Sequence, residues 1–469
     1  MFPIVELPEI VKHYSTWFEP VFSEEALVQF QRYISGLIVS ENKTIEGINR
    51  VIVHESRNQS SLNRLLTASP YSERLLNQQR LALLASLSGT AIKEKGVLSI
   101  DDTLLSHYGS NFEKIAMLWD PVERRYTWAH KLVTLHYSDE QTDYPLLFQL
   151  WEPADLERIE AGLLAAGIPL RAKKFALKES DPKKWRQYLL GVWRRKQAQP
   201  EVAALYASKL LMARRQLAEF VAEHPTLELP VTFDNWYTQP SFCRYIDQEL
   251  QLPYVGTLAK DDKVNLNSGQ ETMAAFSDRL KEEHLEAIKA GDKPLFHKIT
   301  IPYKGEKESY YSFCRTVRVH NFGKQRLVIN YSQPDLSDSP RFFISNRLHW
   351  QATGITRIRR HRWPVEVYHQ EGKAEGLDQY QVRDFQAVTK HVGLVAVTYS
   401  LLRAAPHDSA LKHKLQRHLK FDLDDSAPAW RRATQAQSLW SLSCLIAAGL
   451  SQGQSLDTIL APLMAKIYA

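Results

Sequence analysis

The order of strand-like and helix-like segments between residues 97 and 260 restricts the possible folds more than any other feature of this sequence. Three runs typical of strands come first, at 97–101 (VLSID), 126–138 and 145–153. A mostly helical stretch (154–200) and an amphipathic helix (204–224) follow, and then a buried strand (227–237), a short helix and a last strand (253–260). Strands separated by helices in this way predict an α/β domain built on one sheet.

Two aspartates stand at strand ends in this pattern. Asp101 closes the first strand, and Asp234 closes the fourth. Aspartate is common in turns, so each residue alone is a weak signal. The combination matches the order of a ribonuclease-H-like core, in which adjacent central strands can present the two acids together. We therefore predict an α/β fold with a ribonuclease-H-like catalytic core.

The flanking segments predict further modules, because 469 residues exceed one compact domain. Between 261 and 345 there are too many strand-like pieces for the same core sheet, which indicates a β-rich insertion. The two ends of the chain are helical. The predicted division is a helical DNA-binding domain (1–90), the first part of the core (91–260), the insertion (261–345), the final part of the core (346–400) and a helical C-terminal region (401–469).

Charge and composition favour nucleic acid as the partner. The net charge is +6, and the basic residues cluster in runs at 171–174, 183–186, 194–196 and 357–362. Each of the first three runs alone could equally be a solvated helix face. In the N-terminal helices, basic and small polar residues alternate in a way that suits phosphate and base contacts by a helix-turn-helix-like unit, with a plain helical bundle as the alternative. The basic residues there are Lys43, Arg50, His54, Arg57 and Arg64.

Other classes of protein lack their sequence signals. There is no secretory signal and no apolar stretch long enough to cross a bilayer, so we expect a cytoplasmic protein that is nucleoid-associated when bound to DNA, with no membrane partner. The three cysteines, Cys243, Cys314 and Cys444, are far apart, which supports neither a disulfide framework nor a zinc site. The glycine motifs of nucleotide-binding proteins and the GxSxG motif of serine hydrolases are missing from the sequence.

A third acid, Glu366, lies in the segment RWPVEVYHQEGK. Pro364 suits the first turn of a helix that can end at Gly376. In such a helix Glu366 and Lys373 lie about 20° apart on one face, and Arg362 lies in the turn just before it. Three carboxylates on rigid elements can hold two magnesium ions, which clamp the attacking and leaving oxygens of a phosphoryl displacement.

The spacing Arg362-x3-Glu366-x6-Lys373 resembles the last-acid signature of DDE transposases of the insertion-sequence-four superfamily. The segments around Asp101 (IDDT) and Asp234 (FDNWY) fit the other two acids, and the sequence after 342 resembles the subgroup of insertion sequence seven hundred and one. The resemblance implies two Mg²⁺ ions with Mn²⁺ as a substitute, binding of terminal inverted repeats, and cut-and-paste transposition of double-stranded DNA by a homodimer on paired ends. It also implies that Arg362 and Lys373 hold phosphates.

One position departs from the family pattern, and the choice of the first metal ligand stays open. The family often has Tyr where this chain has Arg359, so a charge interaction from Arg359, beside Arg360, can replace one DNA contact. The Asp-x-Thr pattern favours Asp101, with Thr103, as the first ligand, and Asp102 is the alternative.

Two other functions remain open, namely a ribonuclease-H-fold nuclease without strand transfer and a domesticated, non-catalytic DNA-binding protein.

Overall fold

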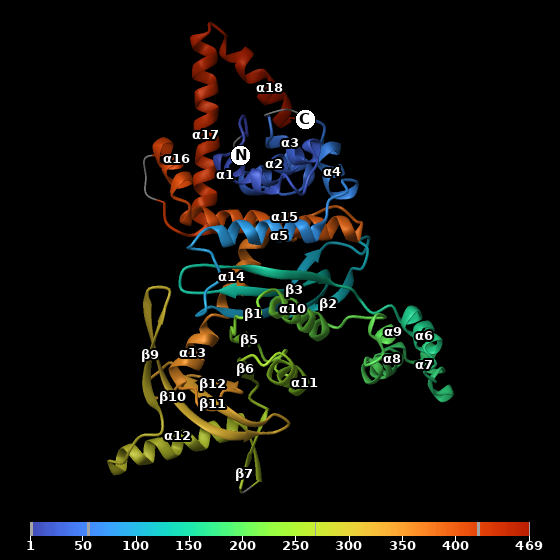
Figure 1. Cartoon of the computed structure of the whole chain (residues 1–469), viewed down its shortest axis with the longest axis vertical. Helices are drawn as coiled ribbons and strands as arrows, with labels where there is room; N and C mark the ends of the chain where they lie inside the picture. The colour runs from blue at the N-terminus through green and yellow to red at the C-terminus, as the bar shows by residue number, and fades with distance from the viewer. Residues whose placement is uncertain (1–2, 54–56, 268, 420–422, 469) are drawn as a thin grey trace.

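The computed structural model describes residues 3–53, 57–267, 269–419 and 423–468. Helices from both ends of the chain form a tier at one end of the molecule, a mixed sheet lies in the middle, and the insertion forms the other end (Figure 1). The predicted α/β fold class is confirmed. No helix in these four ranges is long and apolar enough to cross a membrane.

The core of the sheet has the strand arrangement that the sequence predicts. β1 pairs antiparallel with β3 and parallel with β5, and β5 pairs parallel with β6. β2 and β4 both pair with β3. The strands are β1 (Val97–His107), β2 (Ala116–Asp120), β3 (Arg125–Ser138), β4 (Asp143–Trp151), β5 (Val231–Phe233) and β6 (Tyr254–Leu258).

The expected end of the first strand at Asp101 is wrong. β1 continues through Asp101 and Asp102 to His107, because β3 is long enough to pair with it as far as Trp128. The fourth strand of the sequence pattern, β5, does end directly before Asp234, as predicted. β2, which was not predicted, lies between β1 and β3 in the chain.

The insertion extends the core sheet, contrary to the expectation that its strands lie outside it. β12 pairs antiparallel with β6, and the sheet continues through β11, β10, β7 and β8. Without β12, β6 would be an open edge with unpaired backbone groups. The elements are β7 (Lys263–Leu266), β8 (Gly269–Thr272), α12 (Met273–Ala290), β9 (His297–Tyr303), β10 (Glu306–Val319), β11 (Gly323–Tyr331) and β12 (Arg341–Ser345).

The N-terminal and C-terminal helices share one hydrophobic core. α15 is buried along most of its length and packs against α2, α4, α5, α17 and β4. The N-terminal helices are α1 (Glu9–Ser15), α2 (Glu24–Val39), α3 (Ile45–Val51), α4 (Gln59–Thr67) and α5 (Glu73–Ser86). The C-terminal helices are α15 (Phe385–Ala404), α16 (Ser409–Leu419), α17 (Ala427–Ser451) and α18 (Leu456–Tyr468).

Between β4 and α10, residues 156–203 form a small unit that we call the α6–α9 lobe. Its helices pack on one another around Trp185, Leu189 and Trp193, in a hydrophobic cluster separate from the main core. The lobe stands to one side of the sheet (Figure 1). It comprises α6 (Leu156–Ala165), α7 (Leu177–Ser180), α8 (Pro182–Lys196) and α9 (Pro200–Ala203).

The remaining helices flank the candidate site. α10 (Lys209–Glu223) contacts β3 and β4, and α11 (Pro240–Arg244) follows β5. α13 (Ala352–Arg360) and α14 (Trp363–Ala374) follow the insertion, and α14 packs against β1, β3 and β4.

Candidate active site

Asp101, inside β1, and Asp234, directly after β5, lie at the same level on neighbouring parallel strands. The register pairs Ile100 of β1 with Phe233, the last residue of β5, and each aspartate is the next residue in the chain. Parallel strands lie about 4.8 Å apart. The Asp234 carboxylate accepts hydrogen bonds from the backbone amides of Trp236 (3.0 Å) and Tyr237 (3.1 Å), which orient it after the strand end.

Asp101 and Asp102 point to opposite faces of the sheet, because side chains alternate along a strand. The Asp102 carboxylate binds Lys209 (2.6 Å), Lys131 (3.1 Å) and the Tyr237 hydroxyl (2.9 Å). Burial disfavours its charge, but the two lysines outweigh that effect and lower the pKa of Asp102. Its negative charge is therefore already neutralised within the protein.

Asp101 has a different environment. Burial raises its pKa to about 6, and the nearby Asp234 adds to this shift, while Arg362 opposes it. The Arg362 guanidinium lies 2.5 Å from the Asp101 carboxylate. A carboxylate that is destabilised by desolvation and by a second carboxylate is one that a further cation would stabilise.

Glu366 lies in the first turn of α14, as the sequence predicts. The helix begins at Trp363, with Pro364 in its first turn and Arg362 at its N-cap. The largely buried Arg362 side chain binds both Asp101 and Glu366, so one guanidinium bridges the acid on β1 and the acid on α14.

The carbonyl of His361 fixes the start of α14 to the sheet. It accepts hydrogen bonds from the hydroxyls of Ser99 on β1 and Ser138 on β3, each at 3.0 Å. Both serines are fully buried. The position of Arg362 and Glu366 relative to Asp101 is therefore set by buried contacts between the α13–α14 junction and two central strands.

The three acids, together with Asp102, line one open groove of about 910 Å³. Lys373 also lines this groove. Glu366 and Lys373 therefore lie on one face of α14, as expected. Lys131, Lys209, Trp119 and His369 also line the groove and were not predicted from the sequence, and Trp236 lines it as well. The Lys209 ammonium lies 3.5 Å from the centre of the Trp236 ring. No local motif marks Trp119, Lys131 or Lys209, because they come from β2, β3 and α10.

The donor set of the groove fits a hard divalent cation, since carboxylate oxygens are the ligands that Mg²⁺ prefers. Within the described ranges, however, no three His, Cys, Asp or Glu side chains lie close enough together to form a ready-made metal site. The Arg362 guanidinium occupies the space between two of the acids, where it supplies the positive charge. The acids that this guanidinium bridges are carboxylates that would hold a cation in its place.

Arg359 and Arg360 line a second hollow, of about 510 Å³, which adjoins the groove through Arg362. Arg359 donates a hydrogen bond to Thr257 (2.9 Å), and burial lowers its pKa to about 9. Arg360 pairs with Glu308 of the insertion (2.9 Å) and stacks over the Tyr303 ring. The charge of Arg360 is thus balanced within the protein.

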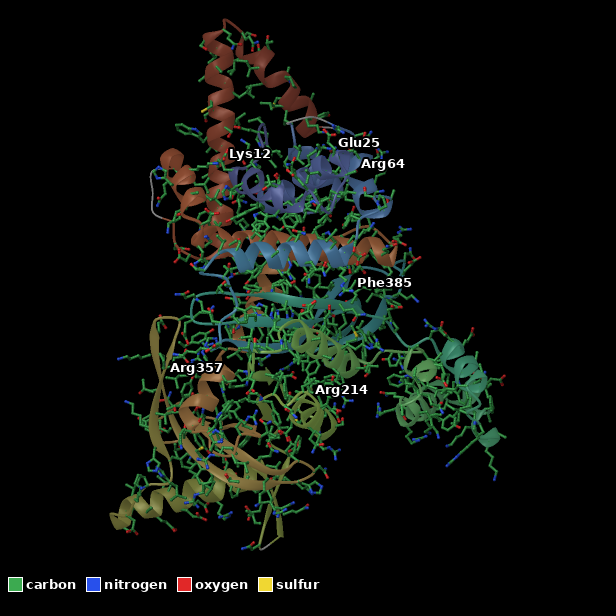
Figure 2. All side chains as sticks on the ribbon, in the orientation of Figure 1. Lys12, Glu25, Arg64, Arg214, Arg357 and Phe385 are labelled. Carbon is green, nitrogen blue, oxygen red and sulfur yellow. The ribbon has the colours of Figure 1, made fainter. Side chains whose placement is uncertain are left out.

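The N-terminal cations do not line the groove. Arg50 pairs with Glu46 at 2.6 Å, and Arg57 and Arg64 are exposed. Arg64 lies in the helical tier (Figure 2). Lys43 is buried and donates to the Leu37 carbonyl, so its ammonium does not face solvent. His54 lies outside the described residues.

Comparison with protein families gives a match over more than half of the chain. Residues 18–270 match the model of the family described as DDE superfamily endonuclease. This range includes Asp101 and Asp234 and ends at the start of the insertion, so Glu366 lies beyond it. No curated protein matches the chain.

Proposed function

This chain belongs to the DDE superfamily endonucleases, and on that basis we propose that it is the transposase of a bacterial insertion sequence, of the insertion-sequence-four superfamily and its subgroup of insertion sequence seven hundred and one. It would cut double-stranded DNA at the terminal inverted repeats and join the freed ends to a target. The main support is that Asp101, Asp234 and Glu366 line one groove together with several cationic side chains, namely Lys131, Lys209, Arg362 and Lys373.

Asp101, Asp234 and Glu366 would hold divalent cations in this proposal, two Mg²⁺ ions with Mn²⁺ as a substitute. When bound, the cations would supply the charge that activates the attacking oxygen and stabilises the leaving oxygen of the phosphodiester. The neutralisation of Asp102 by two lysines favours Asp101 over Asp102 as the first ligand.

Arg362 and Lys373 would bind the DNA strand. With Asp101 and Glu366 bound to a cation, the Arg362 guanidinium would be free to bind two oxygens of one phosphate. Lys373 has no ion-pair partner in the part of the chain that the structure describes. Its ammonium can therefore reach a phosphate in the groove without breaking an existing pair.

The partners follow from the same proposal. Exposed Arg57 and Arg64, with Arg50, would contact the end sequence from the N-terminal helical domain, and Arg359 and Arg360 would lie beside the strand near the acids. Two chains would pair two ends as a homodimer, and the protein would act in the cytoplasm on the nucleoid.

The test is cleavage and joining of a labelled linear DNA that ends in the inverted repeats bracketing the gene. Wild type is compared with Glu366→Gln, and Glu282→Gln, an exposed acid on α12, is the matched control. We expect magnesium-dependent cutting and joining that Glu366→Gln abolishes, that the control retains, and that calcium does not support. Cleavage without joining would indicate a nuclease of the same fold, and end binding without cleavage would indicate a domesticated DNA-binding protein.

A further inference from the structure

Three basic runs that are separate in the sequence, 171–174, 183–186 and 194–196, come together in the α6–α9 lobe. Residues 156–203 contain eleven lysines and arginines against five aspartates and glutamates, a net charge of +6 that equals that of the whole chain. The cationic side chains are exposed, apart from the partly buried Lys174. The excess positive charge of this protein is therefore concentrated in a unit of about one tenth of its length.

Most of these cations are not neutralised within the protein. Lys178 pairs with Glu160, and Lys184 pairs with Asp181. The others have no ion pair among the described residues, and neither do they belong to the acidic groove. These are Arg158, Arg171, Lys173, Lys174, Lys183, Arg186, Arg194, Arg195 and Lys196.

On α8, four of the six cations lie on the side that points away from the lobe's hydrophobic cluster. Lys183 and Arg194 lie about 20° apart around the helix axis, and so do Lys184 and Arg195. Gly191 lies between these two rows, and a Cβ there would meet nothing closer than the Arg195 guanidinium at 3.6 Å. Packing thus does not require this glycine, although glycine inside an exposed helix costs about 1 kcal/mol relative to alanine. A backbone without a side chain lets a rod-like partner approach the two rows closely.

The lobe joins the core at the edge of the acidic groove. The chain enters it after Trp151, which pairs with the groove residue Lys131 across β3 and β4. It returns at Lys209, the first residue of α10, which also lines the groove and binds Asp102. The Trp151 indole donates to the Tyr206 hydroxyl (3.1 Å), which ties the two connections together.

We infer that the α6–α9 lobe binds the sugar-phosphate backbone of duplex DNA that continues outward from the acidic groove. This inference rests on the proposed function only in taking DNA as the occupant of the groove. Contacts made by lysine and arginine to phosphates carry no sequence information, so the lobe would hold any duplex and would do so in a strongly salt-dependent manner.

The test is a titration of full-length protein with a labelled duplex of random sequence, about 30 base pairs long, at several salt concentrations. The lobe variant is Lys183→Glu with Arg194→Glu, two exposed cations without ion pairs on one helix face. The control is Lys289→Glu with Lys293→Glu, which makes the same charge change at the end of α12, on a different side of the molecule (Figure 1). Thermal unfolding of each variant checks its fold, and Lys183→Gln with Arg194→Gln serves as a milder pair.

We expect the lobe variant to bind about 10- to 30-fold more weakly near 0.15 M salt, and its slope of log affinity against log salt to be about 2 smaller in magnitude. The control should match wild type in both respects. Equal losses in the two variants, or no loss in the folded lobe variant, would overturn the inference. A chain that shows lobe-dependent duplex binding but no magnesium-dependent cleavage would contradict the proposed function and leave this inference standing.

Discussion

Asp101 and Asp102 are adjacent in the sequence, but their surroundings shift their pKa values in opposite directions. Asp102 is held by two lysines and a tyrosine hydroxyl, and these contacts lower its pKa. Asp101 has one cationic partner, Arg362, and lies close to a second carboxylate, so burial and repulsion together raise its pKa to about 6. The first residue is suited to bind a cation, and the second is suited to hold the sheet and α10 together.

This contrast predicts opposite effects on stability. Asp101→Asn removes a poorly stabilised charge, so the free energy of unfolding at pH 7.5 should be unchanged or higher, whereas cleavage should be lost. Asp102→Asn leaves Lys209 and Lys131 without their partner in a partly buried site, which should lower the free energy of unfolding by about 2–4 kcal/mol. Urea unfolding of both variants measures the difference. A destabilised Asp101→Asn beside an unaffected Asp102→Asn would reverse the two assignments.

A buried histidine should make the helical tier sensitive to acid. His391 is fully buried, and its Nε2 lies 2.8 Å from the Gly376 carbonyl. A carbonyl only accepts, so Nε2 donates there, and Nδ1 accepts from the Tyr33 hydroxyl at 2.8 Å. Burial lowers the pKa of His391 to about 4 from its ordinary value of 6.5. The folded protein therefore holds the neutral ring.

Because the folded pKa lies below the unfolded one, this contribution to stability is complete above about pH 6.5 and is lost as the pH falls toward 4. We expect the loss to approach 1.4 kcal/mol per pH unit below pH 6 for this residue. His391→Gln, which keeps a donor and an acceptor but does not titrate, should make the curve less steep, and the exposed His349→Gln should leave it unchanged. Unfolding free energies between pH 8 and 4.5, about the range set by these pKa values, provide the check.

Among the elements, the junction between α13 and α14 has the largest bearing on the site. α14 carries Arg362 at its N-cap and Glu366 in its first turn, and its start is attached to β1 and β3 through one carbonyl, that of His361. The helix position therefore depends on two buried serine hydroxyls outside the groove. Small shifts of the helix would move the acid relative to Asp101 and Asp234.

Replacing both serines, Ser99→Ala with Ser138→Ala, should misplace α14. The His361 carbonyl would be left buried with neither hydroxyl, which costs about 1–3 kcal/mol of stability. A displacement of α14 by a fraction of an ångström should slow single-turnover cleavage by about tenfold or more, with little change in DNA affinity. Ser443→Ala, at an exposed serine on α17, is the control. Weaker DNA binding at an unchanged cleavage rate would contradict this role for the junction.

Across the molecule, one buried carboxylate connects the core sheet, the insertion and the C-terminal helices. Asp143, at the start of β4, is fully buried and binds Arg403 and the Tyr399 hydroxyl (2.8 Å) of α15. It also binds Lys304 (2.8 Å) at the turn between β9 and β10 of the insertion. These cations outweigh the effect of burial and hold the pKa of Asp143 well below its usual range.

Asp143→Asn should destabilise the core, the insertion and the C-terminal helices together, and not one of these parts alone. It leaves the largely buried Arg403 without its counter-ion, which lowers the free energy of unfolding by about 3–5 kcal/mol. Because the partners belong to the core, the insertion and the C-terminal helices, far-ultraviolet circular dichroism and tryptophan fluorescence should shift to lower temperature together. Asp261→Asn, at an exposed aspartate, should shift neither signal. Separate thermal transitions in the variant would show that the core, the insertion and the C-terminal helices unfold independently.

Much of the architecture and part of the site could be read from local patterns. The alternation of β-rich and helical runs predicts the core strands and α14, because periodicity depends on neighbouring residues alone. The same applies to the end of β5 at Asp234 and to the helical start at Pro364.

Contacts between residues far apart in the chain decide the features of the fold and of the site that local patterns do not predict. β1 passes through Asp101 because β3 offers it a partner as far as Trp128, and the insertion joins the core sheet because β12 covers the edge of β6. The sequence contains no sign that Lys131 and Lys209 neutralise Asp102, or that three distant basic runs meet in one lobe. Strand pairing, burial and charge balance each depend on which residues meet in space, and residues far apart in the chain acquire those neighbours only when it folds.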